Sequence, residues 1–218
     1  MTIAILLMAA GHSTRFKKAQ NGQHKLLAIE EDHQCSLLEL SYKTVSTVFP
    51  SSDILIVTNQ AEPNVGELAR KISDNNIVIE SDGLGTSIAK GVQSLIKTAP
   101  FLNKYQALFI LPADLPFIQC ETLILLRDLF KKSDKKIIRP TYKAVSGHPV
   151  GFHQALFGEL AQLSGDDGAK KLLKKYEVQY IPVNDPGIVW DIDTPEDLTT
   201  TPNADSWHNI DPNLLDKQ

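Results

Sequence analysis

Short apolar runs alternate along this chain with segments whose apolar residues recur at helical spacing. Residues 2–8 (TIAILLM), 53–58 (DILIVT) and 107–111 (ALFIL) are typical of buried strands, and residues 36–49 and 84–98 show the helical spacing. Runs that are apolar throughout suit a parallel sheet, which is covered on both faces. The alternation therefore predicts an α/β fold with a mostly parallel sheet and helices on both faces.

The rest of the chain continues this alternation. Ser36 and Glu39 predict a capping box at the start of the first long helix, and Thr194 is a candidate cap for the last short one. Residues 1–198 are expected to form a single domain, followed by a polar C-terminal extension at 199–218. Further strands are expected at 77–79, 136–139, 150–152, 178–182 and 188–192, and further helices at 62–73, 120–131, 154–163, 169–176 and 195–198.

Composition narrows the class of protein. The 218 residues carry a net charge of −4, which argues against a large nucleic-acid interface, because such an interface needs a basic face. Cys35 and Cys120 form no metal-binding pair. They could form a single disulfide, but we expect them to be reduced core thiols. We find no secretory signal and no apolar stretch long enough for a membrane helix, so we expect a cytoplasmic protein.

The first strand leads into a turn of small residues and then a cation. Residues 9–11 (Ala-Ala-Gly) keep side-chain bulk low, so backbone N–H groups can approach an anion. Ser13 adds a hydroxyl, Arg15 a fork of donors for phosphate oxygens, and Lys25 a point charge. The pattern is neither a dinucleotide fingerprint nor a P-loop. It indicates a phosphate site, with a plain surface turn as the alternative.

Carboxylates follow two other predicted strands. Asp114 lies between two prolines just after the run 107–111, where it could hold Mg²⁺ or cap a turn. Asp191 and Asp193 are two residues apart and point the same way if the strand 188–192 continues. Asp193 is therefore a candidate second metal ligand, or alternatively a strand-end cap.

Two further regions carry weaker signals. Glycines at the start of residues 81–91 (SDGLGTSIAKG) can present N–H groups to a ligand, or simply form a turn. His148 precedes a proline in GHPVGF, and the segment GDDGAKKLL at 165–173 looks like a helix start. Neither region indicates a function by itself.

Taken in order, these motifs resemble the MobA-like nucleotidyltransferases, and most closely the molybdenum cofactor cytidylyltransferase type. The motifs are MAAGHSTRF with KLL at Lys25, DGLGTSIAKG, LPADLPF, GHPVGF with GDDGAKKLL, and DIDTPEDL, and they cover residues 1–198. The resemblance implies a doubly wound, Rossmann-like fold of the kind found in nucleotide-diphospho-sugar transferases. The GHP and GDxGA pair points to the branch that acts on molybdopterin.

The resemblance also implies roles for individual residues. The Ala-Ala-Gly opening implies CTP, where Ala-Gly-Gly would imply GTP. Arg15, Lys25 and Asp114 would be catalytic, and Asp114 and Asp193 would hold Mg²⁺. Nucleotide contacts would come from Ala9, Ala10, Gly11, Ser13, Ser81, Gly83 and Ser87, and acceptor contacts from His148, Gly165, Asp166 and Gly168.

The sequence departs from the family pattern at two places. Lys17 stands where a glycine is usual, and Lys25 comes ten positions after Arg15, so Lys17 or Lys18 could serve the phosphates instead. The stretch DGLGTS replaces a GMSSS-like loop, which leaves selection of the base open.

The implied reaction needs no protein nucleophile. A phosphate monoester of molybdopterin, ionised at neutral pH, would attack the α-phosphate of CTP and release pyrophosphate, while Mg²⁺ and the cations screen the two anions. GTP as donor, a sugar phosphate as acceptor, and a non-catalytic cofactor carrier or insertion chaperone are the alternatives. The resemblance also allows a transient contact with a client molybdoenzyme. We expect no nucleic-acid partner and no membrane.

Overall fold

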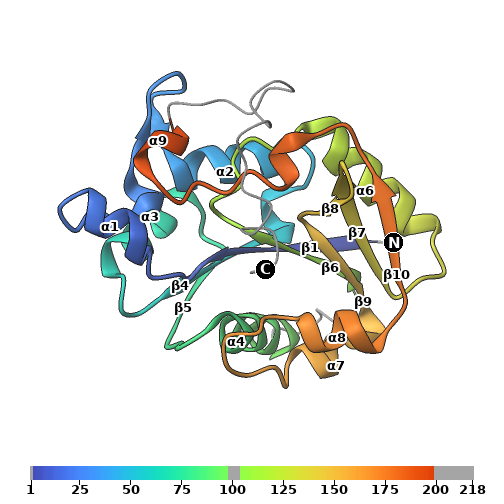
Figure 1. Cartoon of the computed structure of the whole chain (residues 1–218). Coiled ribbons are helices and arrows are strands. Elements are labelled where there is room, and N and C mark those ends of the chain that lie inside the picture. Colours follow the sequence, from blue (N-terminus) through green and yellow to red (C-terminus); the bar gives the residue numbers. More distant parts are fainter. Residues whose placement is uncertain (1, 98–103, 199–218) are drawn as a thin grey trace.

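The N-terminal strand β1 (Thr2–Ala9) lies in the middle of the main sheet of this computed structural model, which describes residues 2–97 and 104–198 (Figure 1). The strand order is β10-β7-β9-β6-β1-β4-β5, with β8 beside β7. The other strands of this sheet are β4 (Ile54–Asn59), β5 (Asn76–Ile79), β6 (Tyr105–Pro112), β7 (Ile137–Tyr142), β8 (Val145–Ser146), β9 (Val150–His153) and β10 (Val178–Pro182).

Most neighbouring strands run parallel. β1 pairs in parallel with β4 and β6, β4 with β5, and β10 with β7, whereas β9 runs antiparallel between β6 and β7. The carboxyl ends of β1, β4 and β6 therefore meet at one edge of the sheet, where ligands bind in folds of this kind. The predicted α/β class with a mostly parallel sheet is confirmed.

Helices cover both faces of the sheet (Figure 1). One face packs against α2 (Leu37–Ser46), α3 (Pro63–Ile72) and α6 (Cys120–Lys132), and the other against α4 (Leu84–Lys97), α7 (Phe157–Leu160) and α8 (Lys170–Lys175). The remaining helical segments are α1 (Thr14–Ala19), α9 (Pro195–Leu198), η1 (Lys25–Leu27), η2 (Ser51–Asp53), η3 (Gln154–Leu156) and η4 (Pro186–Ile188).

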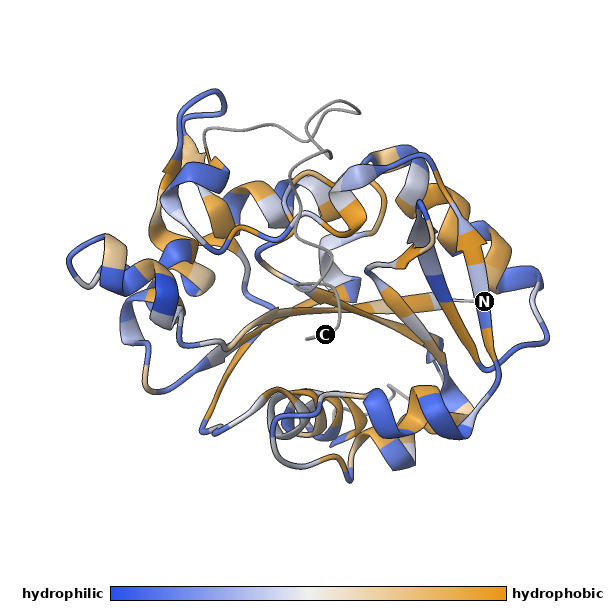
Figure 2. Ribbon diagram, viewed as in Figure 1, coloured by the Kyte–Doolittle hydropathy of each residue, from blue (hydrophilic) through white to orange (hydrophobic). Residues whose placement is uncertain are grey.

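The apolar strands divide their side chains between two cores. On β1, Ile5 and Leu7 pack with the α2, α3 and α6 layer, while Leu6 and Met8 pack with the α4, α7 and α8 layer. Successive side chains of a strand point to opposite faces, so a strand with a core on each side must be apolar at every position. Figure 2 shows this sandwich, with mostly hydrophobic strands between helices of mixed hydropathy.

The predicted helix start at Ser36 is confirmed in detail. The Ser36 hydroxyl accepts a hydrogen bond from Glu39 N (3.2 Å), and Glu39 Oε2 accepts one from Ser36 N (2.8 Å). The same segment is preceded by a small separate ribbon of β2 (Ile29–Glu30) and β3 (Cys35–Ser36). Both cysteines are free, as expected, although Cys120 is only half-buried.

The predicted strand at 188–192 is wrong. A 3-10 turn, η4, occupies 186–188, and an irregular segment leads on to α9. The Asp185 carboxylate accepts hydrogen bonds from Gly187 N and Gln119 N (both 2.9 Å), and this fixes the turn against the segment before α6. Ile188 and Ile192 are buried, so an apolar run here reflects a packed loop rather than a strand.

The other differences are at element ends. The helix expected at 154–163 divides into η3 and the short α7, and β7 continues to Tyr142 because it pairs with β8. No helix in the part of the chain that the structure describes is both long and apolar enough to cross a bilayer. The expected extension at 199–218 lies outside the described residues, so the domain boundary stays a prediction.

Candidate active site

The turn after β1 is held in place by two buried polar side chains. Asn59, at the end of β4, donates from Nδ2 to the carbonyls of Ala10 (3.3 Å) and Ser81 (2.9 Å). His24 donates from Nε2 to the Gly11 carbonyl (2.9 Å), and its Nδ1 accepts from Leu26 N (3.1 Å). Burial lowers the pKa of His24, so the neutral ring that both bonds require is favoured. The turn is therefore fixed before any ligand arrives.

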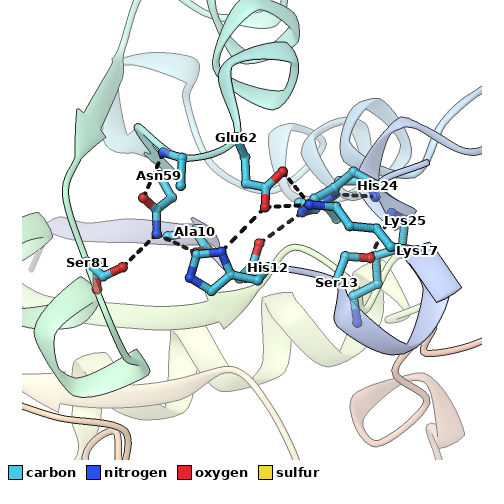
Figure 3. A network of polar contacts seen from close by, with 12 residues as sticks. Ala10, His12, Ser13, Lys17, His24, Lys25, Asn59, Glu62 and Ser81 are labelled. Atoms are coloured by element: carbon cyan, nitrogen blue, oxygen red, sulfur yellow. Dashed lines mark hydrogen bonds and ion pairs between the residues drawn. The ribbon is translucent and has the colours of Figure 1, made fainter. Parts of the chain in front are cut away.

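A second network joins α1 to the start of α3. The Lys17 ammonium contacts both carboxylate oxygens of Glu62 (2.6 and 2.7 Å), and His12 Nδ1 lies 3.4 Å from Glu62 Oε1. Figure 3 shows Glu62 between Lys17 and His12, with Asn59 between Ala10 and Ser81. Lys17 is thus engaged away from Asp114, and Lys18 lies exposed on α1.

Lys25, in contrast, lies between the two predicted metal ligands. Its Nζ is 2.7 Å from Asp114 Oδ2 and 2.8 Å from Asp193 Oδ1, and Arg15 makes an ion pair with Asp193. Burial disfavours the charged ammonium, but the two carboxylates outweigh it and raise the pKa of Lys25. Four predicted residues from three distant segments therefore form one charge cluster at the carboxyl edge of β1 and β6.

The local fold explains how Lys25 reaches this cluster despite its distance from Arg15. Ser13 adopts a left-handed conformation (φ 55°) and starts α1, and the chain then returns through the loop 20–24. The Ser13 hydroxyl accepts a hydrogen bond from Lys25 N (2.9 Å). The segment between Arg15 and Lys25 thus forms a helix and a return loop, which bring Lys25 back beside Ser13 and into the site.

A cavity of about 620 Å³ opens beside this cluster. Its lining includes most of the predicted site residues and runs from the β1 turn across β6 to β9 and α8. Ala9, Ser13, Arg15, Asp193 and Gly165 do not line it; Ala9 is fully buried at the end of β1. The predicted residues in the wall are Ala10, Gly11, Lys25, Ser81, Gly83, Ser87, Asp114, His148, Asp166 and Gly168.

Two predicted loops, one assigned to the nucleotide and one to the acceptor, form a single wall. Gly85 N donates to the Gly165 carbonyl (2.8 Å), and Leu84 N donates to Asp166 Oδ1 (3.2 Å). A Cβ at Gly83 would lie 2.5 Å from the Gly165 carbonyl oxygen, so only glycine permits this contact. The buried Ser87 hydroxyl donates to Ser81 Oγ (2.8 Å) and so stabilises the first loop from within.

His148 lies in the cavity wall, after the β8 segment and before β9. Its Nδ1 is buried and has no hydrogen-bond partner within 2–97 and 104–198. Burial, and then the charge of Arg139, lower the pKa of His148 to about 4. The ring is therefore neutral at physiological pH and adds no positive charge to the cavity.

Asp191 was not a predicted ligand, yet it also lines the cavity. Burial, followed by the charges of Asp114 and Asp193, raises the pKa of Asp191 to about 6. Asp191 thus adds a third carboxyl group to this region, since it lines the cavity together with Asp114. No group of three or more candidate ligands within metal-binding geometry occurs among the described residues. Asp114 and Asp193 nevertheless fit Mg²⁺, which takes one or two protein carboxylates and completes its shell with phosphates and water.

Sequence reasoning missed several residues that build this site. Asn59, His24, Glu62 and Arg139 lie outside every motif that was singled out. Asn59 alone carried a usable signal, because it directly follows a buried strand, as Asp114 does. The others are recognisable only from their contacts.

Most of the chain matches one known domain family. Residues 5–180 match the MobA-like NTP transferase domain. A comparison with curated proteins gives no match.

Solved structures share the fold over most of the chain. Rv0371c from Mycobacterium tuberculosis H37Rv has a TM-score of 0.74 at 23% identity, and the match covers 92% of this chain and 100% of the Rv0371c chain. The complex of Rv0371c with manganese has a TM-score of 0.68. The 4-diphosphocytidyl-2C-methyl-D-erythritol synthase of Anaerococcus prevotii gives 0.62 at 14% identity, covering 91% and 95%. Molybdopterin-guanine dinucleotide biosynthesis protein A of Archaeoglobus fulgidus gives 0.61 at 17%, also covering 91% and 95%. Because the matching domain spans most of its length, this chain belongs to the MobA-like NTP transferase domain family.

Proposed function

We propose that this protein transfers CMP from CTP to the phosphate of molybdopterin, with release of pyrophosphate and dependence on Mg²⁺. The observation that carries the proposal is the cluster of Arg15, Lys25, Asp114 and Asp193 beside the cavity, which Lys25 and Asp114 line. Such a cluster offers cations for a triphosphate and carboxylates for a divalent metal. The manganese complex of a structural relative is consistent with a divalent ion in this fold.

Each part of the site has a task in this reaction. Arg15 and Lys25 bind the phosphate oxygens of the nucleotide and stabilise charge on the departing pyrophosphate. Mg²⁺, held by Asp114 and Asp193, supplies further charge neutralisation when bound. The 81–87 loop would bind the base and ribose, and His148 with the 165–168 loop would face the acceptor. Because these two loops form one wall, the protein holds the two substrates in a fixed position relative to each other. Such positioning is most of the catalysis that this reaction needs.

The choice of CTP rests on the Ala-Ala-Gly sequence of residues 9–11. GTP is the second candidate donor, because a structural relative is named for molybdopterin-guanine dinucleotide biosynthesis. A sugar phosphate is a weaker candidate acceptor, since apolar side chains such as Val150 and Phe152 line the cavity. We also propose a cytoplasmic location, which the free cysteines favour, and a transient contact with a client molybdoenzyme.

The test is pyrophosphate release with each of the four nucleoside triphosphates and Mg²⁺, with and without molybdopterin. Release with CTP only when molybdopterin is present supports the proposal. Release with GTP instead would change the donor and leave the reaction type intact. Tight binding of molybdopterin without release from any triphosphate would make the protein a carrier.

A further inference from the structure

Arg139 is a cation of the cavity wall that the reaction described above does not use. It lies on β7 and is half-buried, and its guanidinium donates from Nε to the Gly147 carbonyl (3.0 Å) and from Nη2 to the Ser146 carbonyl (3.3 Å). None of the carboxylates in the described ranges forms an ion pair with it, and Nη1 has no described hydrogen-bond partner. Burial of a cation without an anion is unfavourable, so this position calls for an anionic ligand.

The sheet register places Arg139 at the end of an apolar floor. Arg139 follows Ile138, which pairs with Gly151, so it lies beside Val150; Val150 in turn pairs with Ile110 on β6. Arg139, Val150 and Ile110 all line the cavity. A ligand on this floor would rest on apolar side chains and meet a positive charge at the β7 side.

The topology also separates Arg139 from the cations of the nucleotide side. Arg15 and Lys25 follow β1, on one side of β6, whereas Arg139 lies on β7, two strand spacings or about 10 Å from β6 on the other side. Asp114 follows β6 and so lies between the two sets of cations. The cavity bridges this separation, because both Asp114 and Arg139 line it.

We infer that Arg139 binds the phosphate of the acceptor and holds it toward the metal site, so that the acceptor must be an anionic molecule with an apolar or flat body. This inference rests on the proposed function. The neutral His148, which also lines the cavity, adds no charge. The guanidinium is already anchored to two backbone carbonyls, so it meets the ligand with little further loss of freedom. Arg139 then selects the acceptor, while Arg15 and Lys25 serve the donor.

Steady-state kinetics with CTP and molybdopterin test this role. Arg139→Gln should raise the KM for molybdopterin about 10- to 100-fold, because a charge-assisted hydrogen bond is lost, and leave the KM for CTP within about twofold. Arg139→Lys, which keeps the charge and loses the fork, should lie between. Arg127→Gln is the matched control, since Arg127 also bonds a backbone carbonyl, that of Val48, but does not line the cavity. Equal rises in both KM values for Arg139→Gln would indicate a structural role and overturn the inference.

A second measurement does not need turnover. With a non-hydrolysable CTP analogue at saturation, inorganic phosphate is titrated while the Nε–H NMR signals of arginine are followed, and the Arg139 signal is identified by its absence in Arg139→Lys. A saturable shift of the Arg139 signal supports the inference, even if the wild-type protein releases pyrophosphate from no triphosphate and the proposed function fails. If the protein releases pyrophosphate from CTP but the Arg139 signal does not move, the inference about Arg139 is overturned and the proposed function is not.

Discussion

Substitution of Lys25 tests what the charge cluster contributes to stability and to turnover. Its ammonium is shared by Asp114 and Asp193, and the three side chains are 12%, 22% and 27% exposed. Breaking a fully buried pair costs about 3–5 kcal/mol, and an exposed pair is worth about 0–1 kcal/mol. Because this cluster lies between those limits, we expect Lys25→Met to lower the free energy of unfolding by about 1–3 kcal/mol.

The matched control is Lys17→Met. Lys17 and Glu62 are 29% and 12% exposed, so this substitution breaks an ion pair of similar burial outside the cluster. Both variants should melt a few degrees lower, at about 2–4 °C per kcal/mol for a chain of this size. Only Lys25→Met should also lose turnover, by about 100- to 1000-fold, because it removes a cation that stabilises developing charge.

Mg²⁺ distinguishes the two variants further. Without Lys25, Asp114 and Asp193 are left facing each other with one cation fewer, and a divalent ion can replace it. Saturating Mg²⁺ should therefore raise the melting temperature of Lys25→Met more than that of the wild type or of Lys17→Met, as followed by circular dichroism. Equal effects of Mg²⁺ on all three proteins, or an equal loss of turnover in the two variants, would refute this account of the cluster.

Three further predictions concern single residues. Asp114→Asn should abolish pyrophosphate release while the far-UV circular dichroism spectrum stays that of the wild type; full Mg²⁺-dependent activity would contradict the metal assignment. Gly83→Ala should raise the KM of both substrates, because a Cβ there would lie 2.5 Å from the Gly165 carbonyl oxygen. The control is Gly158→Ala on α7, where no described atom lies within 4 Å of the added Cβ; it should leave both KM values unchanged and leave stability unchanged or slightly higher. The pKa of His148 falls from 6.5 to about 4 on folding, so the unfolded chain binds more protons between those values. The free energy of unfolding should therefore decrease by up to about 3 kcal/mol as pH falls through that window. Chemical denaturation of wild type and His148→Gln across pH 4–7 should show the difference, and parallel pH profiles would contradict it.

Much of the fold could be predicted because its signals are local. The runs 3–9 of β1, 54–57 of β4 and 107–111 of β6 are apolar at every position, since each has a core on both faces, and Ser36 with Glu39 forms its capping box within one helical turn. The segment 188–192 shows the limit of such patterns. Its apolar residues are as buried as those of a strand, but Asp185 and Gly187 fold the chain into a turn, and burial alone does not distinguish the two.

For the candidate site, the sequence by itself determined which chemical groups are present and at which strand ends: a small-residue turn with Arg15 after β1, and Asp114 after β6. Only the tertiary structure decided which lysine joins them, because Lys17 and Lys25 carry the same charge and both follow Arg15 in the sequence. Their contacts distinguish them: Lys17 pairs with Glu62, and Lys25 pairs with Asp193. The tertiary structure also decided that Arg139 lines the cavity and that the 81–87 and 165–168 loops form one wall. The physical reason is that periodicity and capping act over a few residues, whereas an ion pair between Arg15 and Asp193 joins side chains 178 positions apart and depends on how the whole sheet is ordered.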